Sequence, residues 1–209
     1  MNDKTLRIST AQKEGFLTGN ALLSSGIIIA PAVAAATDFM SALALSIVFC
    51  LVTYITVVLC SFVPSKIVYT VRIILYTLVA SAVYVLVKML MLEIMPIQFE
   101  GLGIYAPLLI TNSLITSKTE TKFYRRKRSY MLVLAGFYVL GYAVSIIMFG
   151  TLRSILVNGT FLGFKVLPVT FPTFTTFYGG FILLALVSAL YRGIVSFAIR
   201  KGTRDDSIS

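Results

Sequence analysis

The side chains that most often carry chemistry in proteins are scarce in this chain. The 209 residues include no histidine, which excludes an imidazole general base, a Ser-His triad or a histidine-ligated haem built from this chain. The two cysteines, Cys50 and Cys60, are ten residues apart in one apolar stretch, or about 15 Å along the axis of a helix. One copy therefore lacks the thiols for a disulfide framework or a four-cysteine zinc site.

Most of the remaining polar residues of interest fall in two apolar stretches, each with a glycine shortly before a proline. In chain order these residues are Asn20, Gly26 and Pro31, and then Gly103, Pro107, Thr111, Asn112 and Ser113. Proline removes a backbone donor and clashes with the preceding turn, so we expect the prolines to interrupt both helices. Freed backbone groups are tolerated at membrane depth only inside protein or along a cavity. We expect the two asparagines to satisfy such groups.

The elements that hold these residues are predicted by composition. Hydrophobic residues make up 58% of the chain and charged residues only 12%, with a mean hydropathy of +0.93, whereas about a quarter of a soluble domain is charged. We predict an all-α integral membrane protein with six transmembrane helices and no large extramembrane domain. The predicted spans are Phe16–Ala36, Phe39–Val63, Ile67–Leu92, Gly101–Ser117, Met131–Gly150 and Phe177–Ile199.

The net charge of +10 is interpreted as a topology signal and not as nucleic-acid binding. With six spans, thirteen Lys and Arg residues fall on the side of both termini and only Arg153 and Lys165 on the other. Both termini are therefore predicted to be cytoplasmic. The basic run at Lys122–Tyr130 is interpreted as a topology determinant that also touches anionic lipid headgroups, with a dedicated lipid-binding or RNA-binding patch as the alternative.

The two interrupted stretches also predict an internal repeat. Their Ala-Pro pairs are 76 residues apart, and each stretch begins a group of three spans. Three is an odd number, so the second group would cross the membrane upside down, which is typical of inverted-repeat proteins. The predicted division is a tail (1–15), a first repeat (16–95), a second repeat (96–199) with a basic loop (118–130), and a tail (200–209). Two ordinary Pro-kinked helices are the alternative.

Several segments resemble one known family. They are Asn20 followed by Pro31, Leu102–Asn112 (LGIYAPLLITN), Gly150–Ser154 (GTLRS) and Asn158–Gly163 (NGTFLG). They resemble the RnfE/NqrD family, whose members are six-span subunits of Rnf and Na⁺-pumping NADH:quinone oxidoreductase complexes. The resemblance runs from about Phe16 to Ile199. It implies a 3+3 inverted repeat in a bacterial cytoplasmic (inner) membrane, with half-helices at the first and fourth spans and a cytoplasmic amino terminus.

The resemblance also implies a cofactor site whose ligands this chain has lost. In the family, each interrupted span supplies one cysteine to an intramembrane [2Fe–2S] cluster, and a homologous RnfA/NqrE-like partner supplies two more. The corresponding positions here are Ala30 and Ser113. Alanine has no ligand atom, and a serine hydroxyl is a poor substitute for the thiolate that such clusters use. We therefore expect no cluster in this chain, with any flavin carried by partner subunits.

Three functions follow from these observations. The first is a non-catalytic membrane subunit of an Rnf/Nqr-like ion-translocating oxidoreductase, bound to a homologous subunit or a second copy. The second is a six-span transporter of a small molecule or ion, whose interrupted helices form the binding site. The third is an assembly scaffold. Iron and flavin analysis would distinguish the first two, and the identity of co-purifying subunits would separate both from the third.

Overall fold

The computed structural model describes residues 20, 22–23, 26, 28–64, 67–112, 114–116, 119, 128–161, 164–165, 168 and 170–206. The elements are α2 (Ile29–Ala35), α3 (Phe39–Cys60), α4 (Tyr69–Ile94), α5 (Pro96–Gly101), the 3₁₀ turns η2 (Gly103–Tyr105) and η3 (Pro107–Thr111), α6 (Arg128–Asn158), β1 (Thr160–Phe161), β2 (Phe164–Lys165), the 3₁₀ turn η5 (Pro172–Thr175) and α7 (Phe177–Asp206).

Four of these helices, α3, α4, α6 and α7, are long and apolar enough to cross a membrane. They coincide with four of the six predicted spans. The predicted all-α class of multi-span membrane protein is confirmed. In the described part of the chain, the exception to helix and turn is one antiparallel hairpin, in which Thr160 pairs with Lys165 and Phe161 with Phe164.

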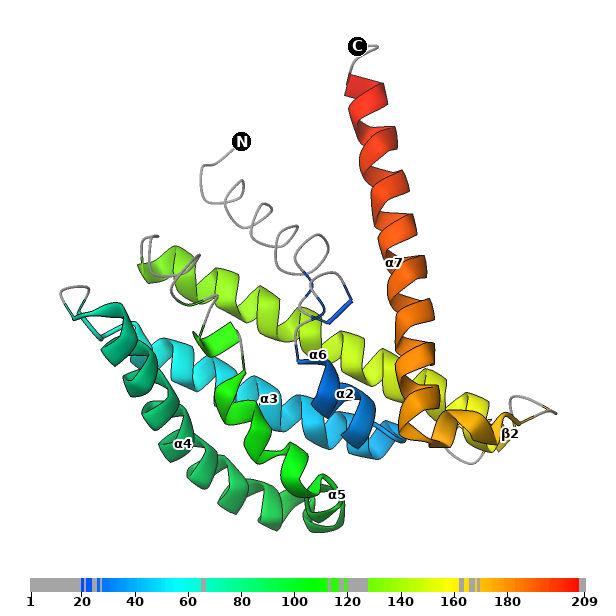
Figure 1. Cartoon of the computed structure of the whole chain (residues 1–209), viewed down its shortest axis with the longest axis horizontal. Helices are drawn as coiled ribbons and strands as arrows, with labels where there is room; N and C mark the ends of the chain where they lie inside the picture. The colour runs from blue at the N-terminus through cyan, green and yellow to red at the C-terminus, as the bar shows by residue number, and fades with distance from the viewer. Residues whose placement is uncertain are drawn as a thin grey trace.

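Helices α3 and α6 lie side by side through the middle of the molecule (Figure 1). They are antiparallel, since Gly150 near the end of α6 lies against Ala42 near the start of α3, and Gly136 lies against Tyr54. A Cβ atom on Gly150 would come within 2.4 Å of the Ala42 Cβ. This crossing therefore requires glycine at position 150, because packed interiors have no room for an extra carbon at that distance.

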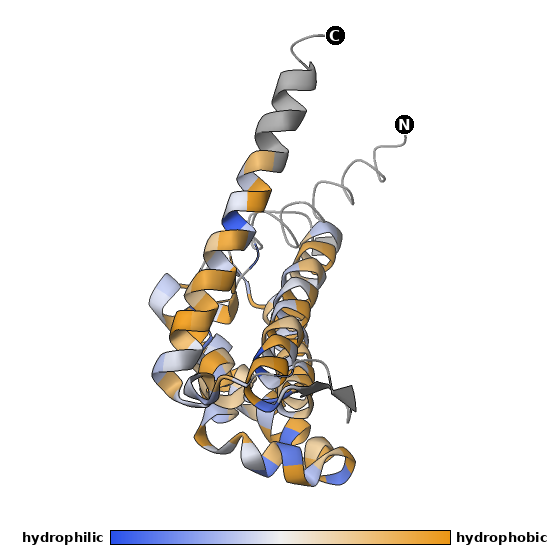
Figure 2. Ribbon diagram, turned by 90° about the vertical axis from the view of Figure 1, so that its right-hand side faces the viewer, coloured by the Kyte–Doolittle hydropathy of each residue, from blue (hydrophilic) through white to orange (hydrophobic). Residues whose placement is uncertain are grey.

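Helices α4 and α7 lie at the outside of this central pair. Both expose large apolar side chains, such as Leu86 on α4 and Phe197 on α7, which are 68% and 72% exposed. Helix α7 projects beyond the other helices (Figure 1), and the part of it that Figure 2 colours is mostly apolar. Exposed apolar faces of this size are typical of helices that contact lipid or another membrane subunit.

Several boundaries differ from the sequence prediction. Helix α6 begins at Arg128, inside the predicted basic loop 118–130, and runs to Asn158 instead of ending at Gly150. The left-handed Gly159 (φ 67°) follows it, and such a residue commonly terminates a helix. Helix α7 continues to Asp206, into the predicted tail 200–209. Arg and Lys are good helix formers, so basic composition alone does not end a helix.

Candidate functional site

In the first interrupted stretch, the residues described before α2 (20, 22–23, 26 and 28) are not helical. Gly26 and Ile28 both have left-handed backbones with φ of 62°, a conformation that a β-branched residue such as Ile28 seldom adopts. Helix α2 begins directly after Ile28. Pro31 is buried as the third residue of α2, where its missing N–H breaks no intrahelical hydrogen bond. The break therefore precedes this proline by a few residues.

The buried carboxamide of Asn20 joins the start of this break to α6. Its Oδ1 accepts hydrogen bonds from the backbone N–H groups of Leu22 (3.1 Å) and Leu23 (3.0 Å). Its Nδ2 donates to the Ser145 hydroxyl (2.8 Å) and to the Gly141 carbonyl (3.1 Å), both on α6. The amide oxygen thus satisfies backbone N–H groups at the break. The amide nitrogen ties the stretch to α6, a helix far away in sequence.

Side chains from α6 and α7 satisfy further carbonyls of the break. The Leu23 carbonyl accepts from the Ser188 hydroxyl (2.6 Å) and from Arg192 Nε (3.3 Å). The hydroxyl of the fully buried Tyr142 donates to the Ile28 carbonyl (2.9 Å). These carbonyls of the irregular backbone are therefore satisfied by protein side chains, which is the condition for such backbone within a membrane.

Arg153 secures the other end of α2. This side chain on α6 is only 1% exposed, and all five acceptors that it contacts are backbone carbonyls. It donates to the carbonyls of Val33 and Ala36 at the end of α2, and to those of Phe174 (2.8 Å) and Thr175 (2.9 Å) in η5. One guanidinium, with its planar fork of donors, joins three segments that the sequence separates.

Sequence reasoning missed this role of Arg153. The sequence prediction places Arg153 in an outer loop, because it ends the fifth span at Gly150. The signal that could have found it was the spacing of Gly150 and Arg153 within the GTLRS segment, which places both on neighbouring faces of one helix. A glycine that permits close helix contact, followed three residues later by a single arginine among apolar residues, indicates that the arginine side chain is buried.

The second interrupted stretch is built differently. It consists of α5, η2 and η3, with Gly103 in the left-handed region (φ 51°) and Pro107 as the first residue of η3. Its freed backbone groups are satisfied mostly by neighbours in sequence, as when the Leu109 N–H donates to the Ala106 carbonyl (3.2 Å). Thr111, the last residue of η3, is exposed, and its hydroxyl donates to the Leu108 carbonyl (3.3 Å).

The buried Asn112 ends this stretch and contacts the opposite half of the chain. Its Nδ2 donates to the hydroxyl of Thr53 on α3 (3.0 Å) and to the Leu109 carbonyl (2.7 Å). Its Oδ1 accepts from the backbone N–H of Ile115 (3.0 Å). Asn112 thus resembles Asn20 in function, since each carboxamide satisfies local backbone and donates to a hydroxyl on a central helix.

The two stretches meet where α2 packs against η2. Ala30 is the second residue of α2 and is exposed. Ser113, the other position predicted to correspond to a lost cluster ligand, lies outside the described residues.

The donors present near these stretches do not fit a [2Fe–2S] cluster. Ala30 offers no ligand atom, and such clusters use thiolates. Both cysteines lie on α3: Cys60 is fully buried against Tyr76 and Ile115, and Cys50 lines a groove described below. Across the described ranges, no three His, Cys, Asp or Glu side chains lie together as a metal site. No chemical step is therefore assigned to a cluster in this chain.

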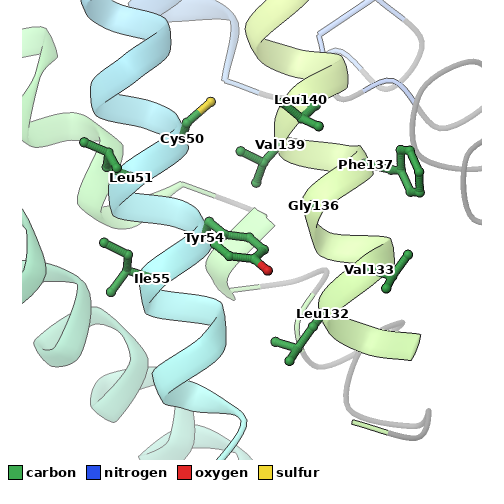
Figure 3. Close-up of a pocket in the computed structure, with 10 residues that line it drawn as sticks. All are labelled: Cys50, Leu51, Tyr54, Ile55, Leu132, Val133, Gly136, Phe137, Val139 and Leu140. Atoms are coloured by element: carbon green, nitrogen blue, oxygen red, sulfur yellow. The ribbon is translucent and has the colours of Figure 1, made fainter. Parts of the chain in front are cut away.

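An apolar groove of about 490 Å³ runs between α3 and α6. Cys50 and Tyr54 of α3 contribute to one wall, and Val133, Gly136 and Leu140 of α6 to the other, with no charged side chain among the lining residues. Figure 3 shows the Tyr54 ring lying between the two helices. The groove can hold an apolar chain, and its lining offers no carboxylate or cation, only the Cys50 thiol and the Tyr54 hydroxyl beside apolar groups.

Comparison with known proteins decides which family these features belong to. A family model described as "Rnf-Nqr subunit, membrane protein" matches residues 8–188, which include both interrupted stretches and Arg153. The chain belongs to the Rnf-Nqr family. The family that the sequence segments resemble is thereby confirmed.

Named relatives of this Rnf-Nqr chain come from two kinds of complex. The E subunit of the ion-translocating oxidoreductase complex of Glaesserella parasuis serovar 5 is 27% identical over 148 residues, which cover 70% of this chain and 64% of the relative. The D subunit of the Na⁺-translocating NADH-quinone reductase of Pseudoalteromonas atlantica is 31% identical over 143 residues, which cover 68% and 67%. The chain therefore matches about two thirds of the length of these relatives.

Proposed function

We propose that this chain is a membrane subunit of an ion-translocating oxidoreductase complex and that it holds no iron–sulfur cluster of its own. The observation that carries the proposal is the family match over residues 8–188, which spans both interrupted stretches. The relatives' names supply the type of complex. The position of Ala30, together with the amide, hydroxyl and carbonyl groups around the breaks, supports a structural role in that complex and not a role as electron carrier.

The same proposal includes the architecture of two inverted repeats, 16–95 and 96–199. The support is reciprocal: Asn20 of the first half donates to Ser145 of the second, and Asn112 of the second half donates to Thr53 of the first. The two asparagines are 92 residues apart, and so are the two hydroxyl residues. A two-fold relation predicts equal offsets of this kind. The Ala-Pro pairs, 76 residues apart, do not share this 92-residue offset between the halves.

Within this architecture each residue predicted at a helix break has a structural role. Asn20 and Asn112 hold the breaks against the central helices. Pro31 lies in the first turn of α2, Pro107 begins η3, and Thr111 satisfies a local carbonyl. The partner is a homologous RnfA/NqrE-like subunit or a second copy of this chain, and cofactors reside on other subunits. Both termini face the cytoplasm of a bacterium.

Purification of the tagged chain from its native membrane tests the proposal. We expect co-purification of other redox subunits, with flavin and iron present in the complex and absent from the chain once it is separated. Recovery of the chain alone, together with solute uptake by vesicles that contain it, would favour the transporter alternative. Stoichiometric iron on the isolated chain would contradict the assignment of Ala30 and Ser113 to the lost ligand positions.

A second experiment restores the missing thiols. We expect no electron paramagnetic resonance signal of a reduced [2Fe–2S] cluster from the native chain or from either single variant, Ala30→Cys or Ser113→Cys, after reconstitution with the partner. The double variant should be required for such a signal, because a [2Fe–2S] centre needs four ligands. The same variants in a Cys50→Ala, Cys60→Ala background provide the control for thiols outside the interrupted stretches.

Topology is tested by labelling cysteines in intact cells. In the Cys50→Ala, Cys60→Ala background, an impermeant maleimide should label Thr170→Cys and leave Ser129→Cys unlabelled. The reverse pattern would place both termini outside the cytoplasm.

A further inference from the structure

A pocket of about 420 Å³ lies where α4 meets the second interrupted stretch. Tyr84, Lys88 and Leu92 of α4 line one side, and Glu100, Gly103 and Pro107 line the other. The interruption itself makes this space. A Cβ on Gly103 would meet no atom within 4 Å, so the 3₁₀ backbone leaves an opening that the side chains of a continuous helix would fill.

The pocket carries two opposite charges on opposite walls. Lys88 and Glu100 both line it and both are exposed, yet neither is paired with the other or with another described side chain. Two opposite charges that face one pocket without meeting are complementary to a molecule that has an anionic and a cationic group.

The position of the pocket along α4 indicates the headgroup level of a bilayer. Lys88 precedes the end of α4 at Ile94 by six residues, or about 9 Å along the helix axis. Ile104, which lines the pocket, is 72% exposed, and Leu108 four residues later in the same stretch is 47% exposed, so the stretch offers apolar surface next to the charges. Charged side chains beside an exposed apolar surface suit a phospholipid, which has a charged headgroup and apolar acyl chains.

We propose that this pocket binds the headgroup of a zwitterionic phospholipid with a primary ammonium, phosphatidylethanolamine. The phosphate lies at Lys88, the ammonium donates hydrogen bonds to the Glu100 carboxylate, and an acyl chain follows Ile104 and Leu108. A phosphatidylcholine headgroup has no N–H to donate to Glu100, and an anionic lipid without an ammonium would place like charge against it. This inference is independent of the proposed redox complex.

Native mass spectrometry of the full chain released from nanodiscs tests the proposal. The nanodiscs contain equal parts of phosphatidylethanolamine, phosphatidylcholine and phosphatidylglycerol with matched acyl chains. We expect phosphatidylethanolamine to be the retained lipid, and we expect Lys88→Gln and Glu100→Gln each to lower its retention about tenfold, since each removes one charge-assisted hydrogen bond. Glu93→Gln, which alters an exposed carboxylate on α4 outside the pocket, should leave retention unchanged.

The exchanged pair Lys88→Glu, Glu100→Lys gives the sharpest outcome. It keeps one charge of each sign at the pocket, so it should restore most of the retention that either single charge removal loses. Equal retention of the three lipids by the native chain would overturn the proposal, and that measurement needs no variant to fold. Retention of phosphatidylglycerol alone, lost on Lys88→Gln but unaffected by Glu100→Gln, would show a simple anion site and overturn the zwitterion assignment.

Discussion

The two interrupted stretches differ in where their backbone hydrogen bonds go. In the first, the carbonyls of Leu23, Ile28 and Val33 accept from side chains on α6 and α7 that are more than one hundred residues away. In the second, the 3₁₀ turns satisfy most groups within three residues, and Asn112 supplies the long-range contact through Thr53. The first break therefore depends on tertiary structure, whereas the second largely supports itself.

This difference separates two ways of making an irregular segment inside a membrane protein. Local 3₁₀ hydrogen bonds keep backbone groups satisfied, and that allows the second stretch to remain partly exposed and to border the pocket at Lys88. In the first stretch, Asn20 satisfies the nearby N–H groups of Leu22 and Leu23. The carbonyls of Leu23 and Ile28 accept instead from side chains on α6 and α7. Substitutions on α6 and α7 should consequently affect the first stretch much more than the second.

The largest effect is expected at Arg153. Arg153→Gln removes most donors to the carbonyls of α2 and η5 and should destabilise the protein by about 3 kcal/mol or more, since each unsatisfied buried acceptor costs about 1–3 kcal/mol. Arg153→Lys should recover only part of the loss, because an ammonium cannot reproduce the planar fork. Thermal unfolding in detergent micelles measures this. A Tm of Arg153→Gln as high as that of the native chain would contradict this role of Arg153.

The next largest losses of stability are expected at the two buried asparagines. Asn20→Ala and Asn112→Ala should each cost about 2 kcal/mol, because both leave buried backbone groups without partners. Double-mutant cycles of Asn20 with Ser145→Ala and of Asn112 with Thr53→Val should give couplings of about 0.6 kcal/mol each, the usual value for interhelical hydrogen bonds in membranes. Equal coupling energies in the two pairs would support the two-fold relation between the halves. A coupling energy in only one pair would contradict that relation.

A smaller loss is expected when a single donor to the first break is removed. Tyr142→Phe keeps the ring packed against Phe49, with ring centroids 4.0 Å apart, but deletes the hydroxyl that donates to Ile28. We expect a loss of about 1–2 kcal/mol, with faster proteolysis of the first stretch than of the second. Tyr54→Phe on α3 serves as the control, because this tyrosine is 39% exposed and borders the groove.

The smallest effect on stability is expected at Asp38, the N-cap of α3, which follows the first stretch in the chain. Its carboxylate accepts from the Met40 N–H (3.1 Å), the Ser41 N–H (3.2 Å) and the hydroxyls of Ser41 (2.6 Å) and Thr37 (3.0 Å). Partial burial raises the pKa of Asp38, but these hydrogen bonds outweigh it, and the pKa lies below its ordinary value of 3.8. Loss of the cap in Asp38→Ala should cost about 1 kcal/mol.

The sign of the pH dependence follows from the lowered pKa of Asp38. The folded state favours the carboxylate, so this stabilisation is fully present above the unfolded pKa of about 3.9 and is lost as the pH falls through the lower folded pKa. Thermal unfolding between pH 7 and pH 3 should show a smaller acid-induced fall in Tm for Asp38→Asn, which caps without titrating, than for the native chain. Identical pH profiles would contradict this contribution.

Much of the fold followed from hydropathy alone. The predicted spans Phe39–Val63, Ile67–Leu92 and Phe177–Ile199 begin within two residues of α3, α4 and α7, because uncharged runs of this length have few other stable states in a bilayer. Helix ends were less predictable. Gly150 has the appearance of a helix end in the sequence, but it is the point where α6 packs against Ala42, and the helix continues for two more turns.

The sequence by itself determined the membrane class, the two interrupted stretches and the family. These properties depend on residue types and short spacings, such as the prolines, the asparagines and the long apolar runs. The tertiary structure decided which donors meet which acceptors: Arg153 at the end of α2, Tyr142 at Ile28, and Lys88 facing Glu100 across a pocket. Hydrogen bonds are short and directional, so a donor more than one hundred residues away is found only once the helices are packed.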